Sequence, residues 1–123
     1  MTNYDLEEGT LLKIQFALTV LLIGSLLISL TLTYNEILKM NEDTPLYDEN
    51  EEIEILSSNR VLALIISLLF LMVNIKDKNL KIKYNQGNLD DANKQIIAGI
   101  LSFLASLIVL GTAITGSVEN PED

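Results

Sequence analysis

Three long apolar stretches dominate the pattern of this chain, over residues 14–34, residues 61–75 and residues 96–118. A helix rises about 1.5 Å per residue, so residues 14–34 would extend about 31 Å, close to a hydrocarbon core of roughly 30 Å. Each stretch is therefore predicted to be a helix that crosses a lipid bilayer. The predicted fold is all-α: an integral membrane three-helix bundle with short loops, in a single membrane domain over residues 1–123.

The middle stretch is too short as it stands. Residues 61–75 would extend only about 22 Å as a helix, roughly a quarter less than the bilayer core. Starting the helix near Ile55 gives a span over residues 55–75 and places Asn59 and Arg60 inside the outer membrane boundary. Arg60 must then extend to the lipid phosphates or find a carboxylate. Glu36 is the nearest candidate, so a Glu36–Arg60 ion pair is one hypothesis and a lipid anchor is the other.

Charge is distributed unevenly between the two sides that three spans define. The N-terminus and the lysine loop, residues 76–94, share one side, which carries six lysines. The acidic loop, residues 35–54, and the C-terminus share the other side, where the only basic residues are Lys39 and Arg60. The positive-inside rule predicts a multi-pass protein of the cell membrane with a cytoplasmic N-terminus and an extracytoplasmic C-terminus. Eleven of the seventeen acids lie outside, and with them the formal net charge of −9.

The first stretch is predicted to remain in the protein rather than to be a cleaved secretory signal. Its apolar run exceeds the roughly 7 to 15 residues of a signal's apolar region. The segment before it carries acids rather than a cluster of lysines, and no pair of small residues spaced for cleavage follows it.

Composition excludes several kinds of site. The chain contains no Cys and no His, the residues that supply thiolate and imidazole ligands. No cofactor, metal site or disulfide is therefore predicted. The spans offer Ser and Thr hydroxyls without a neighbouring base to activate them, so the chain is not expected to be an enzyme. The many Ile, Asn and Lys residues are typical of AT-rich coding and favour a bacterial source.

Small and polar residues recur at helical spacing within the three predicted spans. In the third span they form what we call the small-residue stripe: Ala98, Ser102, Ala105, Val109, Thr112 and Gly116. Similar faces of the other two spans consist of Asn59, Ala63, Ser67, Phe70 and Asn74, and of Ala17, Val20, Gly24, Ile28 and Thr31. Small residues let membrane helices approach closely. These faces are expected to meet in one bundle, or else the small-residue stripe contacts a second copy or another membrane protein.

The connecting segments contain signals for where helices stop and start. The first helix is expected to continue through Met40 and to be stopped by residues 44–45, Thr-Pro. Residues 84–87 are predicted to form a turn. Asn88 is predicted to cap a third helix that begins near Leu89.

The charged loops point to partners rather than to chemistry. The lysine loop is expected to lie near anionic lipid headgroups, and nothing in it indicates nucleic-acid binding. Acids cluster in residues 47–54 and would attract a cationic partner over roughly a Debye length. The cluster lacks the spacing and the interior glycine of a calcium-binding loop.

Two functions remain open from the sequence. The favoured one is a non-catalytic accessory, regulatory or interaction subunit that docks on a larger membrane complex through its acidic loop or its third span. The alternative is an oligomeric pore, as holins form, or a small solute carrier. The chain shares only its size and number of spans with those families. Its acidic C-terminus weighs against a holin, because holins tend to end in a basic tail. The lack of an acid within its spans weighs against a proton-coupled carrier, which needs a carboxylate in the membrane.

Overall fold

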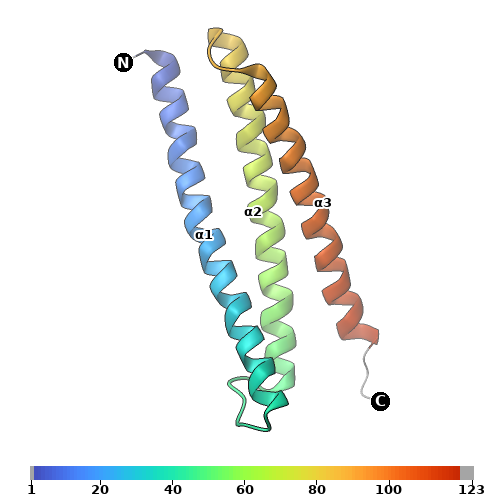
Figure 1. The fold of residues 1–123 in the computed structure, drawn as a ribbon. Helices are drawn as coiled ribbons and strands as arrows, with labels where there is room; N and C mark the ends of the chain where they lie inside the picture. The colour runs from blue at the N-terminus through green and yellow to red at the C-terminus, as the bar shows by residue number, and fades with distance from the viewer. Residues whose placement is uncertain (1, 120–123) are drawn as a thin grey trace.

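A computed structural model describes the backbone of residues 2–119 and the side chains of residues 2–112. The chain forms three helices: α1 (Asn3–Met40), α2 (Glu49–Tyr84) and α3 (Leu89–Glu119). Successive helices run in opposite directions, so the N-terminus and the α2–α3 turn lie at one end, and the α1–α2 loop and the end of α3 lie at the other (Figure 1). No strand occurs within residues 2–119, and the all-α fold is confirmed.

Each of the three helices is long and apolar enough to cross a membrane, as predicted. Large apolar side chains along the middle of the helices point outward: Phe16 is 73% exposed, Leu30 65% and Ile108 69%. A helix that is apolar on nearly all sides is typical of a protein core or of a membrane. Because these side chains lie on the surface of the chain, the fold is compatible with insertion into a lipid bilayer.

The helices are longer than the apolar stretches that predicted them. α1 has 38 residues and continues to Met40, α2 has 36 residues, and only residues 41–48 and 85–88 connect the helices. The acidic loop and the lysine loop are therefore largely helical. A capping box starts α2 early: Asp48 accepts a hydrogen bond from the Glu51 backbone at 2.8 Å, and the Glu51 side chain accepts one from the Asp48 backbone at 3.0 Å.

The turn between α2 and α3 forms where the sequence predicts it. Asn85 ends α2 in the left-handed region, with a φ of 53°, which Asn tolerates better than most residues. The Asn88 side chain accepts a hydrogen bond from the Asp90 backbone at 2.9 Å and so caps the helix that begins at Leu89. These local side-chain preferences are why the turn and the cap could be recognised without a structure.

The contact between α1 and α2 repeats every seven residues and is what we call the α1–α2 seam. Its buried side chains are Leu11, Leu18, Ser25 and Leu32 on α1, and Asn59, Ile66, Val73 and Leu80 on α2. A seven-residue repeat is the spacing of a left-handed coiled coil. The face predicted for the first span is only partly turned inward: Ala17 and Val20 are exposed, whereas Gly24, Ile28 and Thr31 are half-buried. On α1, three of the four buried seam residues are leucines and the fourth is the small residue Ser25.

α2 lies in the middle of the molecule. α1 and α3 both pack against α2, and within the described part of the chain they do not contact each other. The buried Ala92 and the half-buried Gly99 and Phe103 lie on the face of α3 that meets α2. The helices approach closely at Gly99, where a Cβ atom would lie 3.1 Å from Cδ1 of Leu71 and 3.5 Å from its Cα.

The small-residue stripe is not the face of α3 that packs on α2. Ala98, Ser102, Ala105 and Thr112 are all exposed. Gly116 lies beyond the residues whose side chains the structure describes. The packing face instead carries Ala92, Gly99 and Phe103, and Ala98 and Ser102 lie at its edge, where they line a groove. Most of the stripe is thus left on the molecular surface, and its contact with a second copy or another protein stays a prediction.

Candidate functional site

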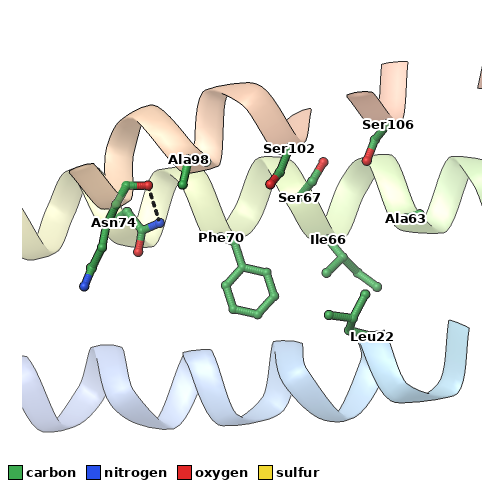
Figure 2. Close-up of a pocket in the computed structure, with 11 residues that line it drawn as sticks. Leu22, Ala63, Ile66, Ser67, Phe70, Asn74, Ala98, Ser102 and Ser106 are labelled. Atoms are coloured by element: carbon green, nitrogen blue, oxygen red, sulfur yellow. Dashed lines mark hydrogen bonds between the residues drawn. The ribbon is translucent and has the colours of Figure 1, made fainter. Parts of the chain in front are cut away.

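A groove lies between α1 and α3 on one side of α2 (Figure 2). It has a volume of about 400 Å³ and a mainly apolar lining. Leu22 from α1 and Phe70 from α2 contribute apolar surface, and Ser67, Ser102 and Ser106 contribute hydroxyls. Figure 2 shows the three serines between α2 and α3, whereas Phe70 points toward α1. We call this feature the serine groove.

Six of the residues that the sequence placed on contact faces come together here, and Ala63, Ser67 and Phe70 are three of them. Asn74, Ala98 and Ser102 all line the serine groove. The Asn74 side-chain amide donates a hydrogen bond to the main-chain carbonyl of Gln95 at 3.3 Å and so ties α2 to α3 (Figure 2). The groove is therefore formed by the packing of α3 on α2, and its small residues Ala98 and Gly99 leave backbone close to its surface.

The hydroxyls in the serine groove differ in how they are bonded. Ser67 donates to the main-chain carbonyl of Leu64 within its own helix at 2.8 Å. Within residues 2–112, the hydroxyls of Ser102 and Ser106 have no hydrogen-bond partner. A polar group without a partner is costly in hydrocarbon, by about 1 to 3 kcal/mol on protein scales. The hydroxyls of Ser102 and Ser106 are therefore available to hydrogen-bond to another group within the apolar segment of the protein.

Two other predicted residues of α3, Ala105 and Thr112, lie outside the groove. Ala105 is exposed and does not line it. Thr112 is exposed too, and its hydroxyl donates to the main-chain carbonyl of Ile108 at 3.0 Å. Gly116 falls outside the described side chains. Of the stripe residues whose side chains the structure describes, Ala98 and Ser102 thus border the groove, and Ala105, Val109 and Thr112 do not.

Asn59 is a buried polar link within the α1–α2 seam, only 4% exposed. Its carbonyl oxygen accepts a hydrogen bond from the Ser25 hydroxyl at 2.8 Å. Its amide donates to the main-chain carbonyl of Ser25 at 3.2 Å and to the Ser29 hydroxyl at 3.0 Å. All three bonds cross from α2 to α1, so Asn59 specifies the register of the two helices. The predicted importance of Asn59 is structural in this arrangement.

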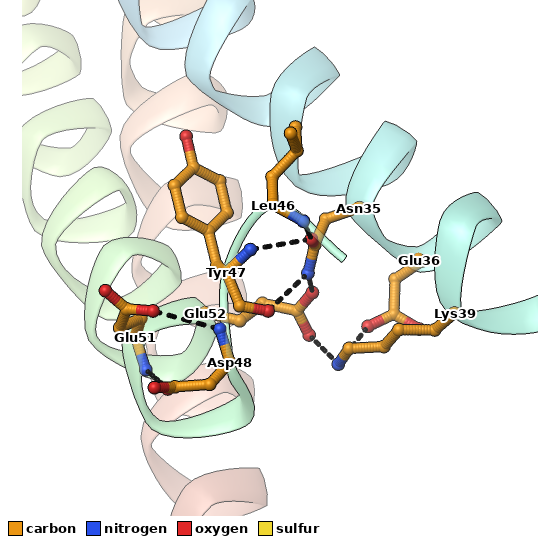
Figure 3. Close-up of polar contacts among 8 residues, drawn as sticks. All are labelled: Asn35, Glu36, Lys39, Leu46, Tyr47, Asp48, Glu51 and Glu52. Atoms are coloured by element: carbon orange, nitrogen blue, oxygen red, sulfur yellow. Dashed lines mark hydrogen bonds and ion pairs between the residues drawn. The ribbon is translucent and has the colours of Figure 1, made fainter. Parts of the chain in front are cut away.

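Asn35 organises the loop between α1 and α2 (Figure 3). It is fully buried, and its side-chain oxygen accepts backbone hydrogen bonds from Leu46 at 2.7 Å and Tyr47 at 3.0 Å. Its amide donates to Glu52 on α2. The role of Asn35 was not predicted from the sequence. The only signal was an amide side chain directly after the first apolar stretch.

The ion pair between Glu36 and Arg60, one of the two hypotheses for Arg60, does not form. Glu36 instead bonds to Lys39 at 3.3 Å, and Lys39 also bonds to Glu52 at 3.0 Å (Figure 3). Among the described side chains, Arg60 has no carboxylate within 4.0 Å, although Glu36 and Arg60 line the same small cavity. Lys39 lies one turn from Glu36 on the same helix, which makes it the nearer cation. The lipid anchor for Arg60 stays a prediction.

Charged residues meet at the other end of the α1–α2 seam. The buried Asp77 bonds to Lys81 at 2.8 Å, and Tyr4 and Tyr84 stack edge to face with ring centres 5.8 Å apart. One oxygen of Asp77 and one of Glu8 are buried without a hydrogen-bond partner. Lys81 is thus an intramolecular partner rather than a free headgroup contact. Sequence analysis missed this cluster because it weighed these residues only as charges that set orientation.

Comparisons with known proteins do not add a family. No family model, no curated protein and no solved structure matches this chain. Within the described residues, no group of three or more Asp, Glu, His or Cys side chains is placed to hold a metal ion.

Proposed function

We propose that this chain is a non-catalytic interaction subunit of a membrane complex, and that its serine groove binds one transmembrane helix of another protein. The observation that carries the proposal is the pair of hydroxyls, Ser102 and Ser106, that have no partner within residues 2–112 although they face an apolar groove. In lipid, such groups favour association with a helix that supplies a hydrogen-bonding side chain. A bound helix would also cover the apolar wall that includes Leu22 and Phe70.

The shape of the groove suits a helix with small residues on its contact face. Ala63, Ala98 and Gly99 line the groove and have little or no side chain. Small residues on one helix let the backbone of a second helix approach closely, which is the usual mode of association in membranes. The partner helix is therefore expected to carry Gly, Ala, Ser or Thr at intervals of four and three residues.

Charge favours a different protein over a second copy. The exposed acids near the α1–α2 loop are Glu42, Asp43, Asp48, Glu49, Glu51 and Glu54. Two copies side by side in one membrane would bring these like charges together, which opposes association. A partner with Lys or Arg beside the corresponding end of its helix would be attracted instead. In the proposed orientation, with the N-terminus in the cytoplasm of a bacterial cell, this end is extracytoplasmic.

Site-specific photocrosslinking in the intact membrane tests the proposal. A photoreactive residue in place of Ala98, which lines the groove, is compared with one in place of the neighbouring Ile97, which is 57% exposed and does not line it. We expect Ala98 to crosslink to one membrane protein with basic residues beside its helix, and Ile97 to crosslink to lipid. Filling the groove with Ser106→Leu should abolish that adduct, and Glu42→Lys with Glu54→Lys should weaken it.

Three results would contradict the proposal. Adducts between two copies of the chain would show that the groove is a homo-oligomer contact. Equal crosslinking from Ala98 and Ile97 would show that the groove is not a binding surface. Rapid dye leakage from liposomes that contain the purified protein alone would favour the pore alternative.

A further inference from the structure

Two carboxyl groups, those of Glu8 and Asp77, lie at the charged end of the α1–α2 seam. Glu8 on α1 faces Asp77 on α2, within hydrogen-bonding range of it. Asp77 is only 6% exposed. Its Oδ2 atom accepts from the Lys81 ammonium at 2.8 Å, while its Oδ1 atom and Oε2 of Glu8 are buried without a partner. Two carboxylates cannot hydrogen-bond to each other unless one of them carries a proton.

The charges around Glu8 are balanced by one added proton. From α1, Tyr4 and Asp5 lie in the same end of the helix; from α2, Asp77 and Lys81 face Glu8. α3 does not contact α1 within the described residues. Lys81 offsets one of the two carboxylates. The second carboxylate is left with no cation of its own, so a proton between the two carboxyl groups makes the buried cluster neutral.

We propose that Glu8 and Asp77 form a proton-binding site in which the two carboxyl groups share one proton and thereby hold the ends of α1 and α2 together. In the bound state, protonated Glu8 donates its hydrogen to the carboxylate of Asp77, which also accepts from Lys81. Loss of the proton leaves two like charges in contact across the seam, and the helix ends separate. The site is independent of the serine groove, which lies farther along α2.

Burial supports this arrangement. Glu8 lies in the first turns of α1, ahead of the apolar segment 14–34 and so outside the membrane-spanning part. Burial, together with the hydrogen bond to Asp77, raises the pKa of Glu8 to about 7. A carboxyl whose pKa is raised in the folded protein stabilises the fold at low pH, and this stability is lost as the pH rises through the folded value. The window of loss is therefore from about pH 4.5 to about pH 7.

A metal ion is a poorer occupant than a proton. The Lys81 ammonium already contacts Asp77 at 2.8 Å, so a cation between the carboxyl groups would lie next to a positive charge. Among the described residues no third acidic side chain is placed with Glu8 and Asp77 to hold a metal ion, whereas Ca²⁺ takes six to eight oxygen ligands. A proton needs only one carboxyl group to carry it and one to accept the hydrogen bond, and Glu8 and Asp77 provide these two groups.

Two measurements on the full chain in detergent test the site. Infrared difference spectra detect the C=O stretch of a protonated carboxyl. We expect this band to fall to half its intensity near pH 7 in the natural protein and to be absent in Glu8→Gln. In parallel, the distance between spin labels at Leu6→Cys and Ile82→Cys should increase from pH 5 to pH 8. Both positions are 55% exposed, and the chain has no other cysteine.

Matched variants separate the site from general effects of charge. Glu7→Gln removes a carboxyl one residue away that is part-exposed and only 4.0 Å from Lys83; it should keep both the band and the distance change. Glu8→Gln should keep the short distance at every pH. If Glu8→Gln fails to fold, the titration of the natural protein still decides. A folded protein with no protonated carboxyl above pH 6, or a band that persists in Glu8→Gln, would overturn the proposal.

Discussion

The Ser25 hydroxyl donates to the side-chain carbonyl of Asn59 at 2.8 Å, in the apolar part of the α1–α2 seam. The Asn59 amide returns two hydrogen bonds to α1, so each helix holds the other at one register. A polar residue at a core position of a coiled coil commonly sets register at some loss of stability. In a membrane the same bonds hold together two helices that gain little from leaving the lipid.

Replacing Asn59 with Ala should destabilise the protein by about 0.6 to 2 kcal/mol, the range found for interhelical hydrogen bonds in membranes. The loss is expected because Ser25 and Ser29 lose their partner on α2. Reversible unfolding in mixed micelles measures it. Ser25→Ala, which removes only one of the three bonds, should cost less, and a double-mutant cycle should show that the two residues are coupled. Purely additive effects would show that the bond contributes nothing.

Replacing Asn35 with Ala should loosen the α1–α2 loop. The change removes the acceptor for the Leu46 and Tyr47 backbone groups and one partner of Glu52. We expect a loss of about 1 to 3 kcal/mol and faster proteolysis within residues 41–48. Asn41→Ala is the matched control, because its exposed side chain lies at the end of the same helix. Equal proteolysis of the two variants would argue against the role of Asn35.

Replacing Gly99 with Leu should force α2 and α3 apart. Even the Cβ atom would lie 3.1 Å from Cδ1 of Leu71 and 3.5 Å from the Asn74 amide nitrogen. Gly99→Ala should be nearly neutral, because a shift of the flexible Leu71 side chain offsets a helix-propensity gain of about 1 kcal/mol. Gly111→Leu is the control, since no atom lies within 4 Å of its added Cβ. Spin-label distances between α2 and α3 measure the separation.

The features that sequence analysis predicted correctly are local or follow from hydropathy. Runs of apolar residues are enough to place three helices, and Asn88 is enough to place the start of α3, because both depend on neighbours in the chain. Helix length was underestimated, since the polar start of α2 depends on the reciprocal bonds of Asp48 and Glu51. A polar segment of this kind looks like a loop when judged by hydropathy alone.

The features that were missed depend on which faces meet. The small-residue stripe and the leucine repeat of α1 both have helical spacing, and spacing alone does not say which one is buried. Glu36 was paired with Arg60 because both were placed near the outer boundary. Lys39 was closer along the same helix. The buried pair of Glu8 and Asp77 arises from two segments far apart in the sequence, and no local pattern indicates it.

Replacing Lys39 with Met should make stability depend on pH at the loop end of the molecule. Lys39 bonds to both Glu36 and Glu52, and these two carboxyl groups also contact each other. The hydrogen bond to Glu52 already raises the pKa of Glu36, and loss of the ammonium should raise it further. A raised carboxyl pKa gives stability that is present at low pH and is lost as the pH rises.

The Lys39→Met variant should therefore be closer in stability to the natural protein near pH 4 than near pH 8. A part of the loss remains near pH 4, because the pKa of Glu52 is lowered and Glu52 stays charged there. The difference at pH 8 should be at most about 1 kcal/mol, since these side chains are partly exposed and solvent screens them. Thermal unfolding in detergent at the two pH values measures it. Lys94→Met is the matched control, because its ion pair with Asp90 is mostly exposed, with side chains 72% and 73% accessible. Lys94→Met should change the stability little at either pH. If it lost as much stability at pH 8 as Lys39→Met, the loss would follow from removing a lysine charge in general and not from the contacts of Lys39.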